Sequence, residues 1–162
     1  MQSLEVLLYE IARLFMAPVL VVLLCMFAYA FFALGAFAWD WARPRTRAQA
    51  LTAYRRRNPG ATLADVELHI MRILEPLRIT SRTAPMLGLV ATMIPMGPAL
   101  VAVTSGNARG VSQNLVVAFS AVIIALLSAA ITFTVLSVRR RWLMTELEAL
   151  RPALEAVEVR HG

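Results

Sequence analysis

The fold is decided by the stretch from Arg82 to Arg141, which reads RTAPMLGLVATMIPMGPALVAVTSGNARGVSQNLVVAFSAVIIALLSAAITFTVLSVRRR. Two apolar segments, 83–104 and 111–138, flank the short polar link 105–110. At about 1.5 Å of rise per residue, the first segment reaches roughly 33 Å, which is enough to cross the core of a bilayer. Because each backbone N–H and C=O in lipid needs an internal partner, we predict a transmembrane helical hairpin.

Both segments carry one face of small or polar residues, which lets helices in lipid approach closely and hydrogen-bond. This face comprises Ala84, Gly88, Ala91, Thr92, Pro95, Ala99 and Ala102 in the first segment, and Asn114, Ala118, Ala121, Ala125, Ser128 and Thr132 in the second. The opposite face of the first segment is bulky: Met86, Leu89, Met93, Met96, Leu100 and Val103. Two interpretations fit this pattern, namely ordinary packing within one bundle, or a close-packed oligomer with a lined pathway.

The rest of the chain also has the composition of a membrane protein. Of its 162 residues, 59% are hydrophobic, and the mean hydropathy is +0.67. The uncharged run 14–39 ends in aromatic residues, as a span does at the water interface, and predicts a first transmembrane helix. The amphipathic segment 1–13 before it is expected to lie in the membrane interface. We therefore predict an all-α integral membrane protein with three transmembrane helices.

The basic residues set the orientation of these spans. The net charge is +6, and every basic residue is an arginine. Fourteen of the 16 lie in the loop 40–82 or in the tail 139–162, against Arg13 and Arg109 elsewhere. The positive-inside rule then places the N-terminus outside and the C-terminus in the cytoplasm, with the link 105–110 in the periplasm. Topology accounts for the arginines, so we expect lipid rather than nucleic acid as their partner.

The cytoplasmic loop is predicted to contain short helices. Thr46 can cap one that runs through Tyr54, and 58–60 (Asn-Pro-Gly) is a turn signal. Thr62 and Asp65 resemble a capping box, which starts the next helix. The expected buried face of that helix holds Leu63, Val66, Ile70, Ile73 and Leu77.

Three further features complete the cytoplasmic part. His69 is expected to be solvated, because it stands alone without other ligand-type residues. Pro76 predicts a kink before the hairpin. The tail 139–162 has an apolar stripe and predicts an amphipathic helix that extends the bundle into the aqueous phase.

The sequence carries no signature of an enzyme: it has no nucleotide-binding loop, no metal-ligand cluster and no nucleophile–base arrangement. We expect no catalytic activity, no cofactor and no metal. Between Arg82 and Arg139 the only ionisable side chain is Arg109. Proton relays in membranes run through Asp, Glu or His, so a carboxylate would have to come from a partner, or water would have to line the path.

The polar candidates for a pathway are Thr92, Asn114, Ser120, Ser128 and Thr132. Thr92 stands out because Pro95 follows it. Pro95 lacks an N–H, so the carbonyl of Ala91 loses its helical donor. A free carbonyl beside a hydroxyl suits water or a partner's protonated carboxyl group. The alternative is a threonine that bonds back to its own helix, beside a simple proline kink.

The run 84–96, APMLGLVATMIPM, resembles the AP-x-LGLLGT-V-x-GM stretch of the MotA/TolQ/ExbB proton-channel family. The layout of three spans is similar to that of TolQ and ExbB. The resemblance implies a pentamer in the bacterial inner membrane around a single-span partner of the ExbD/TolR type. In such complexes the partner's membrane aspartate carries protons between the pore-lining helices.

The resemblance also assigns residues. It places Thr92 on the pore threonine, Asn114 on a glutamate of TolQ and ExbB relatives, and Phe119 on a second threonine, with Ser120 beside it. Ala91 and Pro95 stand where relatives have glycine. The remaining residues that we assign to the helix kink and close packing are Pro85, Gly88, Gly97, Pro98, Ala118, Ala121 and Ala125.

From these features we expect a proton-channel-forming subunit of an ion-driven motor that energises envelope transport. The replacement of the glutamate by Asn114 keeps an alternative open, a non-conducting scaffold that holds a partner's single helix. A third option, an unrelated small bundle such as a holin, fits the size of the chain but not the motif.

Overall fold

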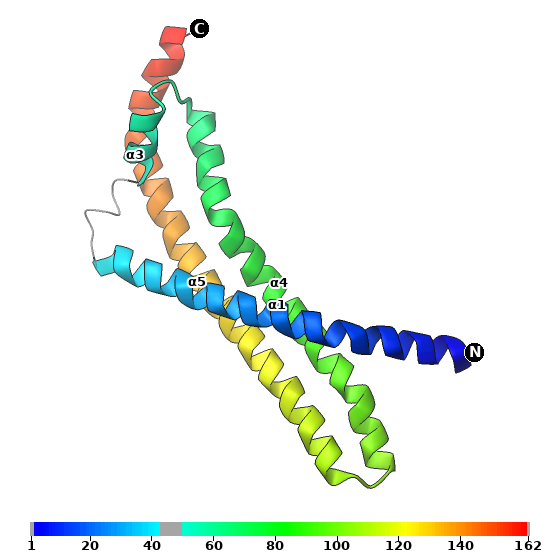
Figure 1. The fold of residues 1–162 in the computed structure, drawn as a ribbon. Helices are drawn as coiled ribbons and strands as arrows, with labels where there is room; N and C mark the ends of the chain where they lie inside the picture. Colours follow the sequence, from blue (N-terminus) through cyan, green and yellow to red (C-terminus); the bar gives the residue numbers. More distant parts are fainter. Residues whose placement is uncertain (1, 43–49, 162) are drawn as a thin grey trace. The chain divides into compact units, whose positions relative to one another are not determined.

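The computed structural model describes residues 2–42 and 50–161. These residues form four helices: α1 (Gln2–Ala42), α3 (Ala50–Arg57), α4 (Leu63–Thr104) and α5 (Ala108–His161) (Figure 1). The prediction of an all-α chain is confirmed for this part. Three helices, α1, α4 and α5, are long and apolar enough to cross a membrane.

Several segments that the sequence analysis separates belong to single helices. α1 continues through the expected boundary at 13/14, α4 through Pro76 and the boundary at 82/83, and α5 through the boundary at 138/139. α4 has 42 residues and α5 has 54, so each is far longer than the roughly 20 residues that a bilayer core requires. Each is therefore longer than one crossing of a bilayer would need.

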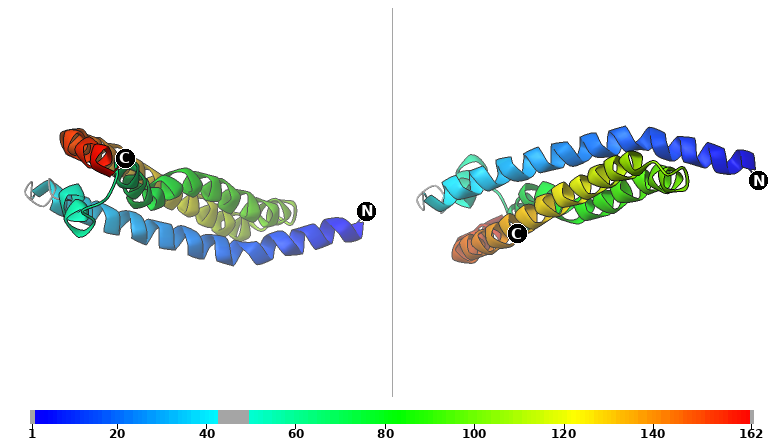
Figure 2. Two further views of the ribbon diagram at one scale, coloured as in Figure 1. Left: turned by 90° about the horizontal axis from the view of Figure 1, so that it is seen from above. Right: turned by 90° about the horizontal axis from the view of Figure 1, so that it is seen from below.

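The chain divides into two compact units. The first comprises Met1–Phe31 and Thr80–Ile131, and the second comprises Phe32–Ile79 and Thr132–Gly162. In the first unit, α4 and α5 lie side by side in both views of Figure 2. Its core consists of Leu23, Ala91, Ala121 and Ala125, with Val19, Leu20 and Leu87 packed against it.

The link between α4 and α5 is a tight turn that ends one helix and starts the next. Gly106 has a φ of 69°, a left-handed conformation that glycine adopts without a steric penalty. Its N–H donates to the carbonyl of Val103 at 3.1 Å, and the N–H of Asn107 donates to that of Ala102 at 2.9 Å. This is the Schellman arrangement. The side-chain Oδ1 of Asn107 then accepts from the N–H of Gly110 at 3.0 Å and caps α5.

The core of the second unit has larger side chains. It consists of Leu51, Ala61, Val66, Ile70, Leu74, Leu143, Leu147 and Leu154. The predicted face of α4 is correct for Val66, Ile70 and Leu77, which are buried. It is wrong for Ile73, which is 36% exposed, since Leu74 takes the buried position. Both residues fit helical spacing after Ile70, and only the contact with α5 decides between them.

The start of α4 confirms the capping box. Oδ2 of Asp65 accepts from the N–H of Thr62 at 3.0 Å, and Oγ1 of Thr62 accepts from the N–H of Asp65 at 3.3 Å. The backbone bond from Thr62, followed by the bond from its hydroxyl, lowers the pKa of the Asp65 carboxyl. The predicted turn before it is also present, because the N–H of Ala61 donates to the carbonyl of Asn58 at 3.1 Å.

Two expectations for the loop need comment. Thr46 lies outside the described residues, and the short helix α3 runs from Ala50 to Arg57, three residues past Tyr54. His69 is half-buried rather than solvated. Its ring stacks on that of Tyr54 with the centroids 3.9 Å apart, so α3 covers it.

Distant contacts hold α3 on α5. Oε1 of Glu146 accepts from the backbone N–H groups of Leu51 at 3.0 Å and Thr52 at 3.3 Å. A carboxylate at the N-terminus of a helix accepts hydrogen bonds from N–H groups that have no partner within the helix, and it interacts favourably with the helix dipole. Leu51 itself is fully buried. At the other end of α3, the guanidinium of Arg55 donates to the carbonyl of Ala153 at 3.0 Å.

Aromatic rings and one ion pair join the end of α1 to α5 within the second unit. The rings of Phe37 and Trp142 stack at 5.2 Å, and Trp41 packs 5.7 Å from Trp142. Beside them, Arg139 pairs with Asp40 at 3.0 Å. Aromatic and arginine side chains together are typical of a membrane–water interface.

We predict that Glu146→Ala loosens α3. Loss of a capping carboxylate costs about 1 kcal/mol, so amide exchange at Leu51 and Thr52 should accelerate about fivefold. Hydrogen-exchange mass spectrometry on the purified chain measures this. Glu148→Ala is the matched control, because Glu148 pairs with the exposed Arg151 at 3.0 Å and, among the described residues, does not bond to α3. Equal acceleration in both variants would contradict a capping role for Glu146.

Candidate functional site

The small-residue faces of the hairpin meet each other in the first unit. A Cβ added at Gly88 would lie 2.6 Å from the Cβ of Ala125 and 3.7 Å from the Cα of Val122. Real Cβ atoms do not approach so closely, so only glycine fits at this position. The predicted close approach of the two helices is confirmed here.

Most members of these faces are buried, whereas Thr92 and Asn114 are half-buried. On α4 the buried members are Ala84, Gly88, Ala91, Pro95, Ala99 and Ala102, and on α5 they are Ala118, Ala121, Ala125, Ser128 and Thr132. Pro85, Gly97 and Pro98 are half-buried. The spacing of three and four residues keeps each group on one side of its helix.

The sequence did not predict that α1 packs against the small-residue faces of α4 and α5. Leu23 is 2% exposed and packs on Ala91, Ala121 and Ala125. The part of α1 that contains Leu23, residues 14–39, is uncharged, so its sequence has no amphipathic pattern that marks one side for packing. Of the two interpretations of the small-residue stripe, packing within one bundle therefore accounts for Ala91, Ala121 and Ala125.

Three of the predicted polar residues bond to their own helices. Oγ1 of Thr92 donates to the carbonyl of Leu89 at 2.7 Å, and Oγ of Ser128 donates to that of Ile124 at 2.7 Å. Nδ2 of Asn114 donates to the carbonyl of Gly110 at 2.9 Å. Thr92 and Asn114 are half-buried, and Ser128 is fully buried. Thr132, in the second unit, is also fully buried.

The side chain of Thr92 is more accessible than that of Ser128. Its hydroxyl donates its hydrogen to the carbonyl of Leu89, so the threonine bonds back to its own helix, as in the second of the two alternatives given above. A hydroxyl oxygen also has two acceptor lone pairs. Because the side chain is half-buried rather than enclosed, these lone pairs can still accept a hydrogen bond from a donor on another chain.

The structure does not bring Phe119 and Ser120 to the packed face. Phe119 is 61% exposed, and Ser120 is also exposed. Ala118 and Ala121 on either side of them are buried, and successive helical residues turn by about 100°, so the two positions point elsewhere. Among the predicted lining residues, four remain at least partly accessible to other molecules in the single chain. They are Phe119 and Ser120, which are exposed, and Thr92 and Asn114, which are half-buried.

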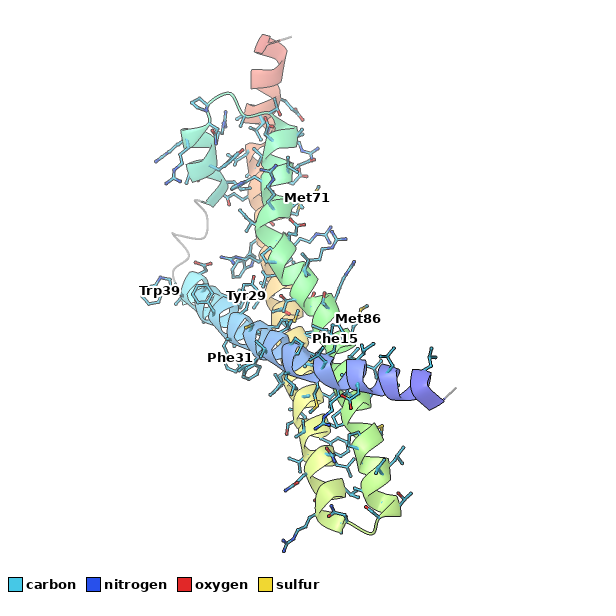
Figure 3. The ribbon with its side chains drawn as sticks, turned by 45° about the vertical axis from the view of Figure 1, so that its right-hand side comes forward. Phe15, Tyr29, Phe31, Trp39, Met71 and Met86 are labelled. Carbon is cyan, nitrogen blue, oxygen red and sulfur yellow. The ribbon has the colours of Figure 1, made fainter. Side chains whose placement is uncertain are left out.

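The bulky face of α4 is exposed along its whole length. Met86, Leu89, Met93, Met96, Leu100 and Val103 are each between 55% and 68% exposed. Figure 3 shows Met86 on the outer side of α4. α4 is long and apolar enough to cross a membrane, and an exposed apolar face on such a helix suits contact with lipid or with other helices.

Within the described residues, no group of three or more His, Cys, Asp or Glu side chains could hold a metal ion. Comparison with known proteins does not assign the chain to a family. No family model, no curated protein and no solved structure matches the chain.

We predict that Gly88→Ala separates α4 from α5. Overpacking of a close contact costs about 1–3 kcal/mol, so the variant should unfold at a lower denaturant concentration in detergent. The swap Gly88→Ala with Ala125→Gly should restore most of the loss, because it returns one methyl group to the same gap. The stability of both variants is measured by thermal or denaturant unfolding in detergent.

Gly35→Ala is the matched control. A Cβ at Gly35 meets nothing within 4 Å, so that variant should be neutral or slightly more stable. A swap variant that is no better than Gly88→Ala alone would contradict the contact.

Proposed function

We propose that this chain is a channel-forming subunit of a proton-driven motor complex of the ExbB and TolQ type, in the bacterial inner membrane, and that it acts without catalytic activity of its own. The observation that supports this most is the hairpin of α4 and α5. Its small faces pack closely at Gly88 and Ala125, while the half-buried Thr92 stays at the margin of the packed region. Together with the run 84–96, this is the arrangement expected of a subunit that offers one threonine to a partner.

The proposal requires an acidic partner. Apart from Arg109, the segment 83–138 has no ionisable side chain, so its own groups offer acceptors but no proton carrier. A single-span protein with an aspartate at the depth of Thr92 would supply the carrier. The expected assembly is a pentamer of this chain around two copies of that partner, engaged in envelope transport.

A second function is favoured by a different observation. The side chains of Thr92, Asn114 and Ser128 donate to carbonyls of their own helices. A scaffold that only holds a partner's helix needs packing surfaces and no exchangeable donors. The two functions differ in one respect that can be measured, which is whether the partner has an intramembrane carboxylate.

Native mass spectrometry of the complex purified from its own membranes in mild detergent separates the two. For the motor, we expect five copies of the chain with a small single-span protein that carries a membrane aspartate. A bare oligomer, or a partner without an intramembrane carboxyl group, would favour the scaffold. Neither component would then carry a titrating group across the bilayer.

Thr92→Val tests the role of the hydroxyl in that purified complex. The two side chains have nearly the same shape, so assembly should persist while proton flux in vesicles falls about threefold or more, as expected for the loss of one hydrogen bond in lipid. Thr104→Val is the matched control. Thr104 donates to the carbonyl of Val101 at 2.8 Å in the same way, but it lies exposed at the end of α4.

Loss of flux in Thr104→Val as well would indicate a general effect of removing such hydroxyls. Full flux in Thr92→Val would remove Thr92 from the pathway.

A further inference from the structure

A second candidate site lies in the second unit, between α3 and α5. It is a cavity of about 410 Å³ lined by Thr52, Arg55, Arg56, Pro59 and Leu150. The cavity is open rather than enclosed. Thr52, Arg55 and Arg56 are its polar residues, and Pro59 and Leu150 are its apolar ones.

The positive charge of this cavity is not neutralised within the part of the chain that the structure describes. The ion pairs there include Arg139 with Asp40 and Arg151 with Glu148. Neither Arg55 nor Arg56 pairs with a carboxylate among these residues. No acidic side chain lines the cavity, and α3 contains three arginines and no acid.

The neighbouring carboxylates are already engaged. Glu146 caps the start of α3 at 3.0 Å from the N–H of Leu51, and Glu148 pairs with Arg151. Two of the C-terminal carbonyls of α3 share a donor, because the N–H of Asn58 lies 3.0 Å from the carbonyl oxygen of Tyr54 and 3.2 Å from that of Arg55. The charged residues that line the cavity are both arginines.

One of the two arginines is held in place. A terminal nitrogen of Arg55 donates to the carbonyl of Ala153 at 3.0 Å, which orients the planar guanidinium and leaves its other donors for a ligand. Arg56 is exposed and free to close on a ligand. A fixed guanidinium loses less conformational entropy when it binds.

From this geometry we infer that the cavity between α3 and α5 binds a phosphate group. A guanidinium fork takes two oxygens in its bidentate mode. A carboxylate or a phosphodiester has two free oxygens and satisfies one fork, whereas a phosphate monoester has three and inorganic phosphate has four, enough to reach both Arg55 and Arg56. The source is either the monoester headgroup of a phosphatidic acid, whose glycerol would contact Leu150 and Pro59, or a soluble phosphate. This inference does not depend on the proposed channel function.

Two titrations of the purified full-length chain in detergent distinguish the sources. In one, native mass spectrometry counts adducts with phosphatidic acid, a phosphate monoester, and with phosphatidylcholine, a diester with only two free oxygens. In the other, calorimetry follows inorganic phosphate, with sodium acetate as the carboxylate control. Preference for phosphatidic acid without phosphate binding identifies the lipid source, and binding of inorganic phosphate identifies the soluble source. Equal binding of the two lipids with no response to phosphate would overturn the inference, and so would acetate binding as strong as that of phosphate.

The variants tie binding to the cavity. Arg55→Gln with Arg56→Gln should weaken binding about tenfold or more, as expected for the loss of charge-assisted bonds. Arg56→Gln alone serves if the double variant disturbs α3, because Arg56 is exposed. Arg57→Gln is the matched control: it removes the same charge from the same turn but does not line the cavity. Equal weakening in the control would mean diffuse attraction to positive charge and would overturn the site.

Discussion

The contact between Gly88 and Ala125 sets the distance between α4 and α5, and the rest of the first unit follows from it. In lipid, helices gain nothing from the hydrophobic effect when they associate, because lipid tails are as apolar as their side chains. Association then depends on how closely the backbones approach. Between Gly88 and Ala125 there is one methyl group instead of two, so the helices lie close together. Ala91 and Ala121 then belong to the same core, and Leu23 of α1 packs against it.

The two cores of the chain differ in the size of their side chains. The core around Leu23 is otherwise made of alanines, whereas the core of the second unit contains five leucines with Val66 and Ile70. Where the alternative is water, burial of large apolar side chains stabilises a core by roughly 25 cal/mol per Å². The change from small to large core residues along α4 and α5 agrees with the composition of the sequence, in which the arginine-rich parts are those expected outside the membrane.

Local patterns were enough to predict much of this structure. The buried and exposed faces of α4 follow from helical spacing, and the capping box follows from Thr62 and Asp65. What could not be predicted depends on contacts between distant residues. Glu146 caps α3 from 95 positions away, and nothing near either residue in the sequence signals it. Ile73 and Leu74 both suit a helical period, so the choice between them needed the partner helix. Phe119 was assigned by resemblance and Ser120 as a polar side chain of its segment, and their exposure in one chain is compatible with a role only at a surface shared with another chain.

The hydrogen bond from Thr92 to Leu89 limits what this residue can do for a partner's acid. With its hydrogen engaged, the hydroxyl can accept a bond from a protonated carboxyl group but cannot donate to an ionised one. A bond made to the neutral form of an acid raises its pKa, and a low-dielectric surrounding does the same. A partner's aspartate beside Thr92 would thus be held neutral and would lose its proton only after moving away from the threonine. On the proposed function, proton release is then coupled to movement of the partner, and Thr92 acts without titrating itself.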